Sequence, residues 1–292
     1  MHSRWLLNLG LLALVAILSL VVVQLHDVSK DTLQQPLTAL RAGEIERLRI
    51  VYPNDKPVVL TKRAGRWWLE APVHARANQA KLRNLAALAA ATTELRLPAD
   101  SDNLRKFGLN PPKARLWLND KEVAVGIQHP FKNARYVFYH DSVYLIPAHH
   151  FAPAAYRYRE LIDTKLLDDE RTPSALKLPA LSLRQQNGAW VLEPPNETIT
   201  PDQINAFIDN WRFARAFAVQ PYSGGEARGS ILLTFTQGAA EKKKLETLEL
   251  GILSYKPELV LYRQDEGLEY RFTEDVAKRL LRLTLTKPPD DK

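Results

Sequence analysis

The sequence predicts an α+β protein, in which an N-terminal transmembrane helix precedes two duplicated units that each combine an antiparallel sheet with a helix. Three observations predict this fold class. A long apolar run without charge occupies residues 5–25. A tryptophan-containing motif occurs twice in the rest of the chain. Around each copy the apolar residues alternate or cluster in short runs, as they do in strands.

The N-terminal run is long enough to cross a membrane. As a helix rising 1.5 Å per residue, residues 5–25 would cover about 31 Å, close to the roughly 30 Å hydrocarbon core of a bilayer. Arg4 precedes the run, and Asp27 and Asp31 follow it, which favours an N-terminus in the cytoplasm. No later stretch is long and apolar enough to span. We therefore expect residues 27–292 to be extracytoplasmic, and periplasmic in a bacterium.

A cleaved signal peptide and a buried core helix are the two alternatives to an uncleaved anchor. A signal peptide has a shorter apolar core and ends in small residues at its cleavage site. The run at 5–25 ends in Val22-Val23-Gln24-Leu25-His26, without a small pair at a plausible cleavage point. The sequence therefore predicts a single-pass protein of the bacterial inner (cytoplasmic) membrane.

The rest of the chain contains an internal duplication. Residues 65–72 read Gly-Arg-Trp-Trp-Leu-Glu-Ala-Pro and residues 188–195 read Gly-Ala-Trp-Val-Leu-Glu-Pro-Pro, with five identities at an offset of 123. Residues 123–127 similarly resemble residues 248–252 at an offset of 125. The repeat predicts two related units that pack together. The expected parts are a cytoplasmic stub and transmembrane helix at 1–26, a juxtamembrane linker at 27–44, a first unit at 45–165, a linker at 166–173, a second unit at 174–285 and a polar tail at 286–292.

Strands are expected in the same order in both units. Each unit begins with a hairpin, turning at Ala64-Gly65-Arg66 in the first and at Asn187-Gly188 in the second, where the dipeptide favours a tight turn. The first unit is expected to have strands at 45–51, 58–62, 67–69, 114–118, 122–127, 134–140 and 143–146. After its hairpin, the second is expected to have strands at 230–236, 245–252, 258–263 and 268–272.

One helix is expected after each hairpin. In the first unit Asn78 is a fair N-cap for a helix to about Thr92, and in the second Thr200 and Pro201 supply an N-cap and a proline at the first helical position. Ser101 or Asp102 is expected to cap a short turn. Two closing helices are expected, one over 149–162 and one after Thr273, extending to Leu283.

The composition narrows the classes of function. The chain has no cysteine, which excludes disulfides, thiolate metal sites and cysteine nucleophiles. Its net charge of +7 is modest for 292 residues and does not indicate a nucleic-acid-binding protein. The charge is unevenly distributed, because residues 27–165 carry 22 basic and 14 acidic residues, whereas residues 166–292 carry 17 and 19. A basic unit next to the membrane favours contact with anionic headgroups or an acidic partner, although a dispersed basic surface is the simpler interpretation.

Aromatic and basic residues suggest an interaction surface. Trp67 and Trp190 repeat with the fold and are expected to be core residues. Trp68 points to the opposite face of its strand, where it either packs under a helix or is exposed, and an aromatic platform for sugars is a further possibility. The stretch 156–159 mixes aromatic and basic side chains, as interfacial surfaces do. The candidate surface residues are Trp68, Tyr156, Arg157, Tyr158 and Arg159.

No catalytic or metal-binding pattern is recognisable in the sequence. The seven histidines lack metal-ligand spacing. Ser223 lacks the glycine spacing of a nucleophile elbow, and no glycine-rich phosphate loop occurs. Glu70 and Glu193 recur with the repeat, which shared ancestry of a turn explains better than a catalytic pair. We expect no enzyme activity, no cofactor and no metal.

The motifs resemble a known family. Gly-Arg-Trp-Trp-Leu-Glu-Ala-Pro at 65–72, Phe-Gly-Leu-Asn-Pro-Pro at 107–112, Val125-Gly126 and Val-Tyr-Leu-Ile-Pro at 143–147 follow one N-terminal membrane helix. This combination resembles a bacterial family of membrane-anchored envelope proteins with a domain of unknown function, the 4340 family. The resemblance implies an accessory role beside ABC-type transporters of the gliding-auxiliary kind, and it implies no catalytic residues. The second unit has Ser223-Gly224-Gly225 in place of the segment at 107–112.

The preferred hypothesis is therefore a membrane-anchored envelope protein that binds a protein partner in a transport or assembly complex. One alternative is a carrier that holds a lipid or glycan in a cleft between the units. A second is a hydrolase that uses Glu70 or Glu193. The identity of the partner and the oligomeric state stay open.

Overall fold

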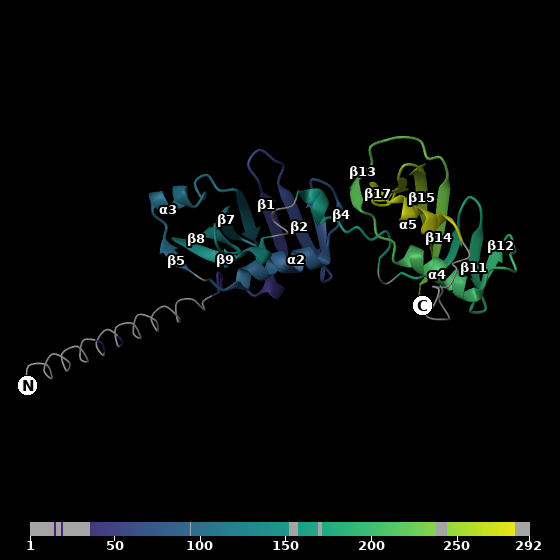
Figure 1. Ribbon diagram of the computed structural model, residues 1–292, viewed down its shortest axis with the longest axis horizontal. Helices are drawn as coiled ribbons and strands as arrows, with labels where there is room; N and C mark the ends of the chain where they lie inside the picture. The colour runs from purple at the N-terminus through teal and green to yellow at the C-terminus, as the bar shows by residue number, and fades with distance from the viewer. Residues whose placement is uncertain are drawn as a thin grey trace, which may run out of the picture. The chain divides into compact units, whose positions relative to one another are not determined.

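A computed structural model describes residues 15, 19, 36–93, 95–151, 157–168, 171–237 and 244–283. The expected membrane span at 5–25 lies outside the described residues, apart from Val15 and Ser19, and so does the tail at 286–292. Within the described part of the chain, no helix has the length and apolarity needed to cross a membrane. The chain forms two compact units that divide after Leu161, with the short segment Val73–Ala75 grouped with the second (Figure 1).

The first unit is built on a sheet with the strand order β4-β3-β2-β1-β6-β7-β8-β9-β5. From β3 to β5, all neighbouring strands run antiparallel. The strands are β1 (Arg47–Val51), β2 (Val58–Arg63), β3 (Arg66–Ala71), β4 (Ala75–Arg76), β5 (Arg96–Pro98), β6 (Ala114–Leu118), β7 (Lys121–Gln128), β8 (Ala134–Tyr139) and β9 (Ser142–Pro147).

The second unit is built on a sheet with the order β12-β11-β10-β14-β15-β16-β17-β13, in which all neighbours are antiparallel. The strands are β10 (Pro173–Lys177), β11 (Ser182–Gln186), β12 (Ala189–Glu193), β13 (Ala218–Pro221), β14 (Ser230–Gln237), β15 (Lys244–Ser254), β16 (Leu259–Arg263) and β17 (Leu268–Phe272).

The two sheets have the same strand order. This is seen when β1–β3 are matched to β10–β12, β5 to β13, and β6–β9 to β14–β17. Only β4 of the first sheet has no equivalent in this alignment. Each unit therefore has three antiparallel strands that end in a hairpin, then a helix, an edge strand and a four-stranded meander. The two hairpin turns also match, because Ala64 and Asn187 have φ values of 48° and 50° and are each followed by a glycine with positive φ. The expected α+β architecture with two repeated sheets is confirmed.

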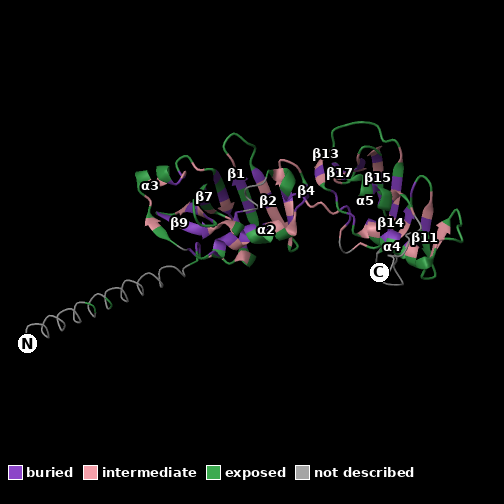
Figure 2. Cartoon of the chain, in the orientation of Figure 1, coloured by how far each residue is buried: buried purple, intermediate pink, exposed green. Residues whose placement is uncertain are grey.

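The helices begin close to the predicted caps. The Asn78 side chain accepts a hydrogen bond from the Lys81 backbone at the start of α2 (Gln79–Ala86). Thr200 and Gln203 form a reciprocal capping box on α4 (Pro201–Arg212). Helix α5 (Glu274–Leu281) follows Thr273 as expected, but it ends two residues before the expected Leu283 and the Thr273 side chain makes no capping hydrogen bond. These three helices turn apolar residues toward the core, and Figure 2 shows buried residues alternating with more exposed ones along the strands.

Three expected elements need correction. The helix after Asn78 ends at Ala86 and tightens into a 3-10 turn, η2 (Ala87–Ala90), instead of reaching Thr92. The N-cap of α3 (Ser101–Lys106) is Asp100, whose carboxylate accepts from the Asn103 backbone, and neither Ser101 nor Asp102. In place of a helix over 149–162, the described residues form two 3-10 turns, η3 (Ala148–His150) and η5 (Tyr158–Leu161). The sequence has a proline at 153, which cannot donate a helical hydrogen bond.

The two repeated tryptophans do not share an environment. Trp67 is 3% exposed, whereas Trp190 is only half-buried, so the expectation that both are core residues is wrong for Trp190. The Gln79 side chain accepts from the Trp67 backbone N–H at 2.9 Å and donates to its carbonyl at 3.0 Å, which covers the outer edge of β3. Strand β12 is the terminal strand of its sheet. Its residues from Ala189 to Glu193 are all exposed or half-buried.

Candidate interaction surface

One face of the first sheet carries arginine and tryptophan side chains over β1, β2, β3 and β6, and we call it the basic face. Arg47 pairs with Thr61, and Thr61 pairs with Trp68 on the next strand. Arg49 pairs with Val59 on one side and with Trp117 on the other. Because directly paired residues point the same way, these side chains share the face opposite the buried Leu48, Leu60 and Leu69. The basic face comprises Arg47, Arg49, Val59, Thr61, Arg63, Trp68, Glu70, Arg115, Trp117 and Glu122.

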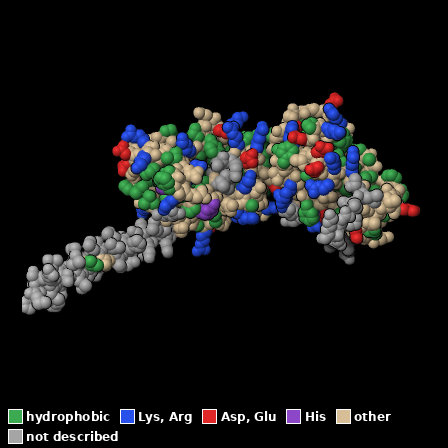
Figure 3. Space-filling view, in the orientation of Figure 1, with side chains coloured by type: hydrophobic (Ala, Val, Ile, Leu, Met, Phe, Trp, Pro, Cys, Tyr) green, Lys and Arg blue, Asp and Glu red, His purple; other side chains and the backbone are tan. Residues whose placement is uncertain are grey.

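The two carboxylates of the basic face are both held in ion pairs. Glu70 accepts from the Thr61 hydroxyl at 2.6 Å and from Arg63 at 2.9 Å. Glu122 lies 2.5 Å from the Arg115 guanidinium. The remaining two arginines, Arg47 and Arg49, are exposed and give this face a surplus of positive charge. Lys and Arg side chains occur at many points on the side of the first unit seen in Figure 3.

Arg49 lies above Trp117, with its guanidinium carbon 5.0 Å from the ring centroid. A cation over an indole face at this distance is attracted by the ring quadrupole. The pair places an exposed cation over an aromatic ring on the two central strands β1 and β6. The sequence analysis missed both residues, although the alternation Arg47-Leu48-Arg49-Ile50 in a predicted strand signals an exposed basic row.

A small pocket adjoins the basic face. It has a volume of about 340 Å³, and the Arg115–Glu122 pair forms part of its wall. Half of its lining residues are apolar, and these come from α3, the segment after it, β7 and β8. The lining residues are Leu104, Leu109, Asn110, Arg115, Glu122, Ala124, Phe138 and His140.

The segment at 107–112 that carried the family resemblance covers the other half of this sheet face. The Phe107 ring stacks on Tyr136 with 3.9 Å between centroids, and the Phe107 carbonyl accepts from the Ile127 backbone at 2.9 Å. Gly126 makes this approach possible, since a Cβ there would lie 2.2 Å from the Phe107 oxygen. The motif glycines are therefore structural, and this segment closes an apolar cluster with Leu109 and Leu145.

The structure does not bring the predicted surface residues into one patch. Trp68 lies on the basic face. Arg157, Tyr158 and Arg159 lie in or next to η5, which is fastened to the start of α2 because the Leu161 carbonyl accepts from the Asn78 backbone at 2.8 Å. The Gln79 side chain at the start of α2 hydrogen-bonds the backbone of Trp67. Arg159 also folds back onto the Tyr158 hydroxyl at 3.2 Å. Tyr156 lies outside the described residues.

The residues weighed for catalysis are held in structural contacts. Glu193 pairs with Arg184 at 2.8 Å, much as Glu70 pairs with Arg63 in the first hairpin. The rings of His149 and His150 lie 4.0 Å apart, and burial together with the charge of His149 lowers the pKa of His150. Among the described residues, no cluster of three or more histidine, aspartate or glutamate side chains could hold a metal ion.

The second unit repeats the aromatic stack with different residues. Tyr222 stacks on Tyr262 with 4.0 Å between centroids, in the way that Phe107 stacks on Tyr136. Tyr262 pairs with Gly251, the equivalent of Gly126 in the repeat. The Tyr222 segment therefore packs on the sheet of the second unit as the 107–112 segment packs on the sheet of the first, although the two sequences differ.

A buried carboxylate distinguishes the second unit from the first. Glu269 pairs with Tyr262 across the sheet, as the apolar Leu145 pairs with Tyr136. It is 1% exposed and accepts from the backbone and hydroxyl of Ser223 and from the Gln220 amide, at 2.7 to 2.9 Å. Burial alone would raise the pKa of Glu269, but these hydrogen bonds and Arg271 outweigh it and lower the pKa. Glu269 is therefore a charged group that holds the 220–223 segment.

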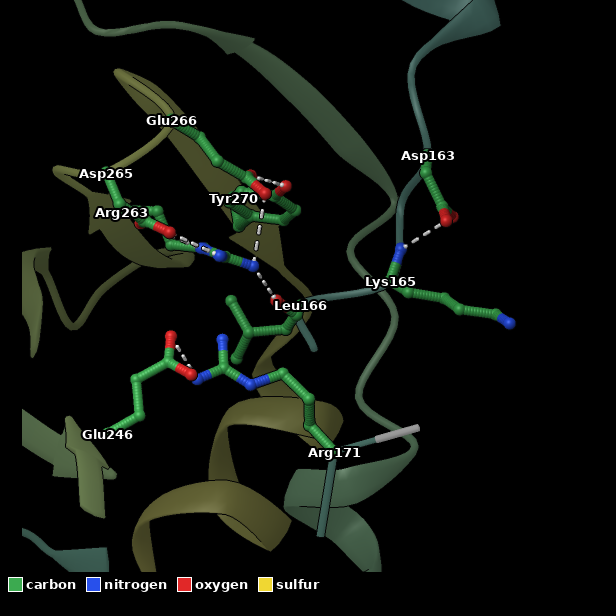
Figure 4. Close-up of polar contacts among 9 residues, drawn as sticks. All are labelled: Asp163, Lys165, Leu166, Arg171, Glu246, Arg263, Asp265, Glu266 and Tyr270. Atoms are coloured by element: carbon green, nitrogen blue, oxygen red, sulfur yellow. Dashed lines mark hydrogen bonds and ion pairs between the residues drawn. The ribbon is translucent and has the colours of Figure 1, made fainter. Parts of the chain in front are cut away.

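A second buried network ties the start of the second unit to its sheet (Figure 4). Arg263 is 3% exposed and donates to the Leu166 carbonyl at 2.6 Å. Its guanidinium also contacts Asp265 at 2.6 Å and Glu266 at 3.2 Å, and Glu266 accepts from the Tyr270 hydroxyl. The position equivalent to Arg263 in the first unit is the buried Val137, so the network is particular to the second unit.

The fold and these surfaces define a class of protein: a tandem of antiparallel sheet modules, each with a leading hairpin and one helix after it. A family model described as a domain of unknown function, DUF4340, matches residues 67–219, and the chain belongs to that family. The match begins in β3 and ends in β13, so it includes parts of both units. No curated protein and no solved structure matches the chain.

Proposed function

We propose that the protein is a single-pass, membrane-anchored envelope protein of bacteria, and that its first unit binds an acidic protein partner in a transport or assembly complex. The apolar run at 5–25 would form the anchor and leave both units in the periplasm. The role is one of binding and not of catalysis.

The observation that carries this proposal is the Arg49–Trp117 stack on the basic face. Arginine and tryptophan, together with tyrosine, are enriched at the energetic centres of protein interfaces, where these large side chains fill well-packed pockets. The surrounding Arg47 and Trp68 extend the same surface. An acidic partner surface would complement the charge and increase the rate of association.

Photo-crosslinking in native membranes tests the proposal. A photoreactive amino acid at Val59, directly opposite Arg49, is expected to form an adduct with one partner protein. Arg49→Glu in the same chain should abolish the adduct, because removing a central arginine costs about 2 kcal/mol or more of binding free energy. Ser182 is the matched control position, since it is equivalent to Val59 in the second hairpin at the offset of 123.

The proposal fails if the adduct persists with Arg49→Glu or forms equally from Ser182. The anchor is tested separately by carbonate extraction of the membranes. Release of the full-length chain into the supernatant would rule out a spanning helix. The binding of a partner by the basic face would then be decided by the crosslinking result only.

A further inference from the structure

The hairpin between β7 and β8 ends in a tip, residues 129–133, that carries a fully solvated aromatic side chain. Phe131 is 93% exposed, the highest value among the large apolar residues that the structure describes. Exposing a phenyl ring to water is unfavourable. Single exposed apolar residues are common on protein surfaces, and what distinguishes Phe131 is the ordered loop that carries it and the lysine directly after it.

The tip is held in a defined conformation. The Nδ1 atom of His129 accepts from the backbone N–H groups of both Phe131 and Lys132, each at 3.1 Å. The His129 ring in turn lies over Tyr136, with 5.7 Å between centroids. At the other end of the tip, the Asn133 carbonyl accepts from the Ala148 backbone at 2.8 Å. Phe131 is therefore presented by a loop whose backbone is already ordered.

Lysines and a second apolar residue lie around this tip. Lys132 follows Phe131 directly, and Lys106 lies over the Phe107 ring at 5.5 Å. Ile127, which leads into the tip on β7, is 38% exposed. An aromatic ring with lysines beside it matches the boundary of an anionic membrane, where the ring enters the acyl region and the ammonium groups contact headgroups.

We propose that the 129–133 tip inserts Phe131 into the interface of an anionic membrane. This inference rests on the proposed membrane anchor, which would place the first unit beside the bilayer. The excess of eight positive charges in residues 27–165 complements an anionic membrane, and the proposed anchor would put that membrane next to this unit, so we take lipid as the occupant. The tip shares no residue with the basic face, so the unit would use one set of residues for lipid and another for its partner.

The absence of cysteine allows a direct test. Phe131→Cys introduces the only thiol of the full-length chain, and an environment-sensitive NBD label there reports whether the tip enters lipid. The labelled protein is reconstituted into phosphatidylcholine vesicles with and without phosphatidylglycerol. We expect a blue shift and a several-fold increase in emission only with phosphatidylglycerol, and quenching by spin-labelled lipid. The control is Phe213→Cys, a 64% exposed position of the second unit, whose label should not respond.

Three results would overturn the inference. They are equal emission from both labels, a response that does not depend on phosphatidylglycerol, and a response that appears only after other envelope proteins are added. The last would indicate a protein-binding tip. Lys132→Glu should reduce the response at position 131, and circular dichroism checks that each variant is folded. Neither the crosslinking from Val59 nor the carbonate extraction depends on this label, so the proposed function can fail or succeed independently.

Discussion

The carbonyl oxygen of Phe107 lies 2.2 Å from the point where a side chain at Gly126 would begin. This approach lets the segment at 107–112 lie against β7, where Phe107 stacks on Tyr136. A second glycine, Gly108, has a φ of 63°, which few other residues adopt without strain. The family motif thus identifies a packing arrangement within the first unit.

Gly126→Ala should destabilise the protein markedly. The new methyl group would meet a backbone atom that cannot rotate away, and overpacking of this kind costs about 3 kcal/mol. Denaturant unfolding of the full-length protein, followed by tryptophan fluorescence, measures the change. Gly43→Ala is the matched control, because a Cβ there would meet nothing within 4 Å. Equal stability of the two variants would show that the Phe107 segment does not pack on β7.

Replacement of the repeated tryptophans should give unequal losses of stability. Trp67→Ala removes a 3% exposed side chain and should cost about 3–5 kcal/mol. Trp190→Ala removes a half-buried side chain on a terminal strand and should cost clearly less, about 1–2 kcal/mol. The comparison uses the same unfolding measurement for both variants. A Trp190→Ala loss as large as that of Trp67→Ala would contradict the edge position of β12.

Arg263→Met should be strongly destabilising, although methionine fills a similar volume. The variant leaves the carboxylate of Glu266 and the Leu166 carbonyl without their buried cation, and breaking such a network costs about 3–5 kcal/mol. Arg263→Lys should also be destabilising, because the lysine ammonium lacks the planar, forked donors with which the guanidinium contacts several acceptors at once. Full stability of either variant would show that the network does not fasten the Leu166 segment.

Glu269 should make the stability of the protein depend on pH in the acid range. Its pKa is lower in the folded state than its ordinary value of 4.5, so the unfolded chain binds a proton more readily. The contribution of Glu269 is therefore present above pH 4.5 and is lost as the pH falls through the folded pKa. Glu269→Gln should flatten the dependence, measured by denaturant unfolding at a series of pH values. Glu197→Gln at an exposed position is the control, and an identical pH profile for wild type and Glu269→Gln would contradict the assignment.

The features predicted correctly from the sequence are governed by neighbours along the chain. The hairpin turns at Gly65 and Gly188 depend on adjacent residues that tolerate positive φ. The caps Asn78 and Thr200 depend on the backbone three residues later. Helix ends were predicted less well, because the transition to the 3-10 turn Ala87–Ala90 reflects packing and not a local stop signal.

Sequence reasoning missed the centre of the candidate surface because that surface depends on strand order. Arg49 and Trp117 lie far apart in the chain and meet only because β1 pairs with β6 as well as with β2. The predicted surface also mixed separate elements, since Trp68 lies on β3 and Tyr158 lies in η5, which is bonded to the start of α2. Alternation along a strand shows which residues share a side, but it does not show what covers that side.

The sequence by itself determined the duplication, the order of hairpin, helix and meander in each unit, and the caps and turns that begin these elements. Only the tertiary structure decided which tryptophan is buried, how Phe107 approaches Gly126, and where the buried charges of Arg263 and Glu269 find their partners. The reason is physical. Turns and caps are made by atoms a few residues apart, whereas burial and charge pairing depend on strands and loops that folding brings together from distant parts of the chain.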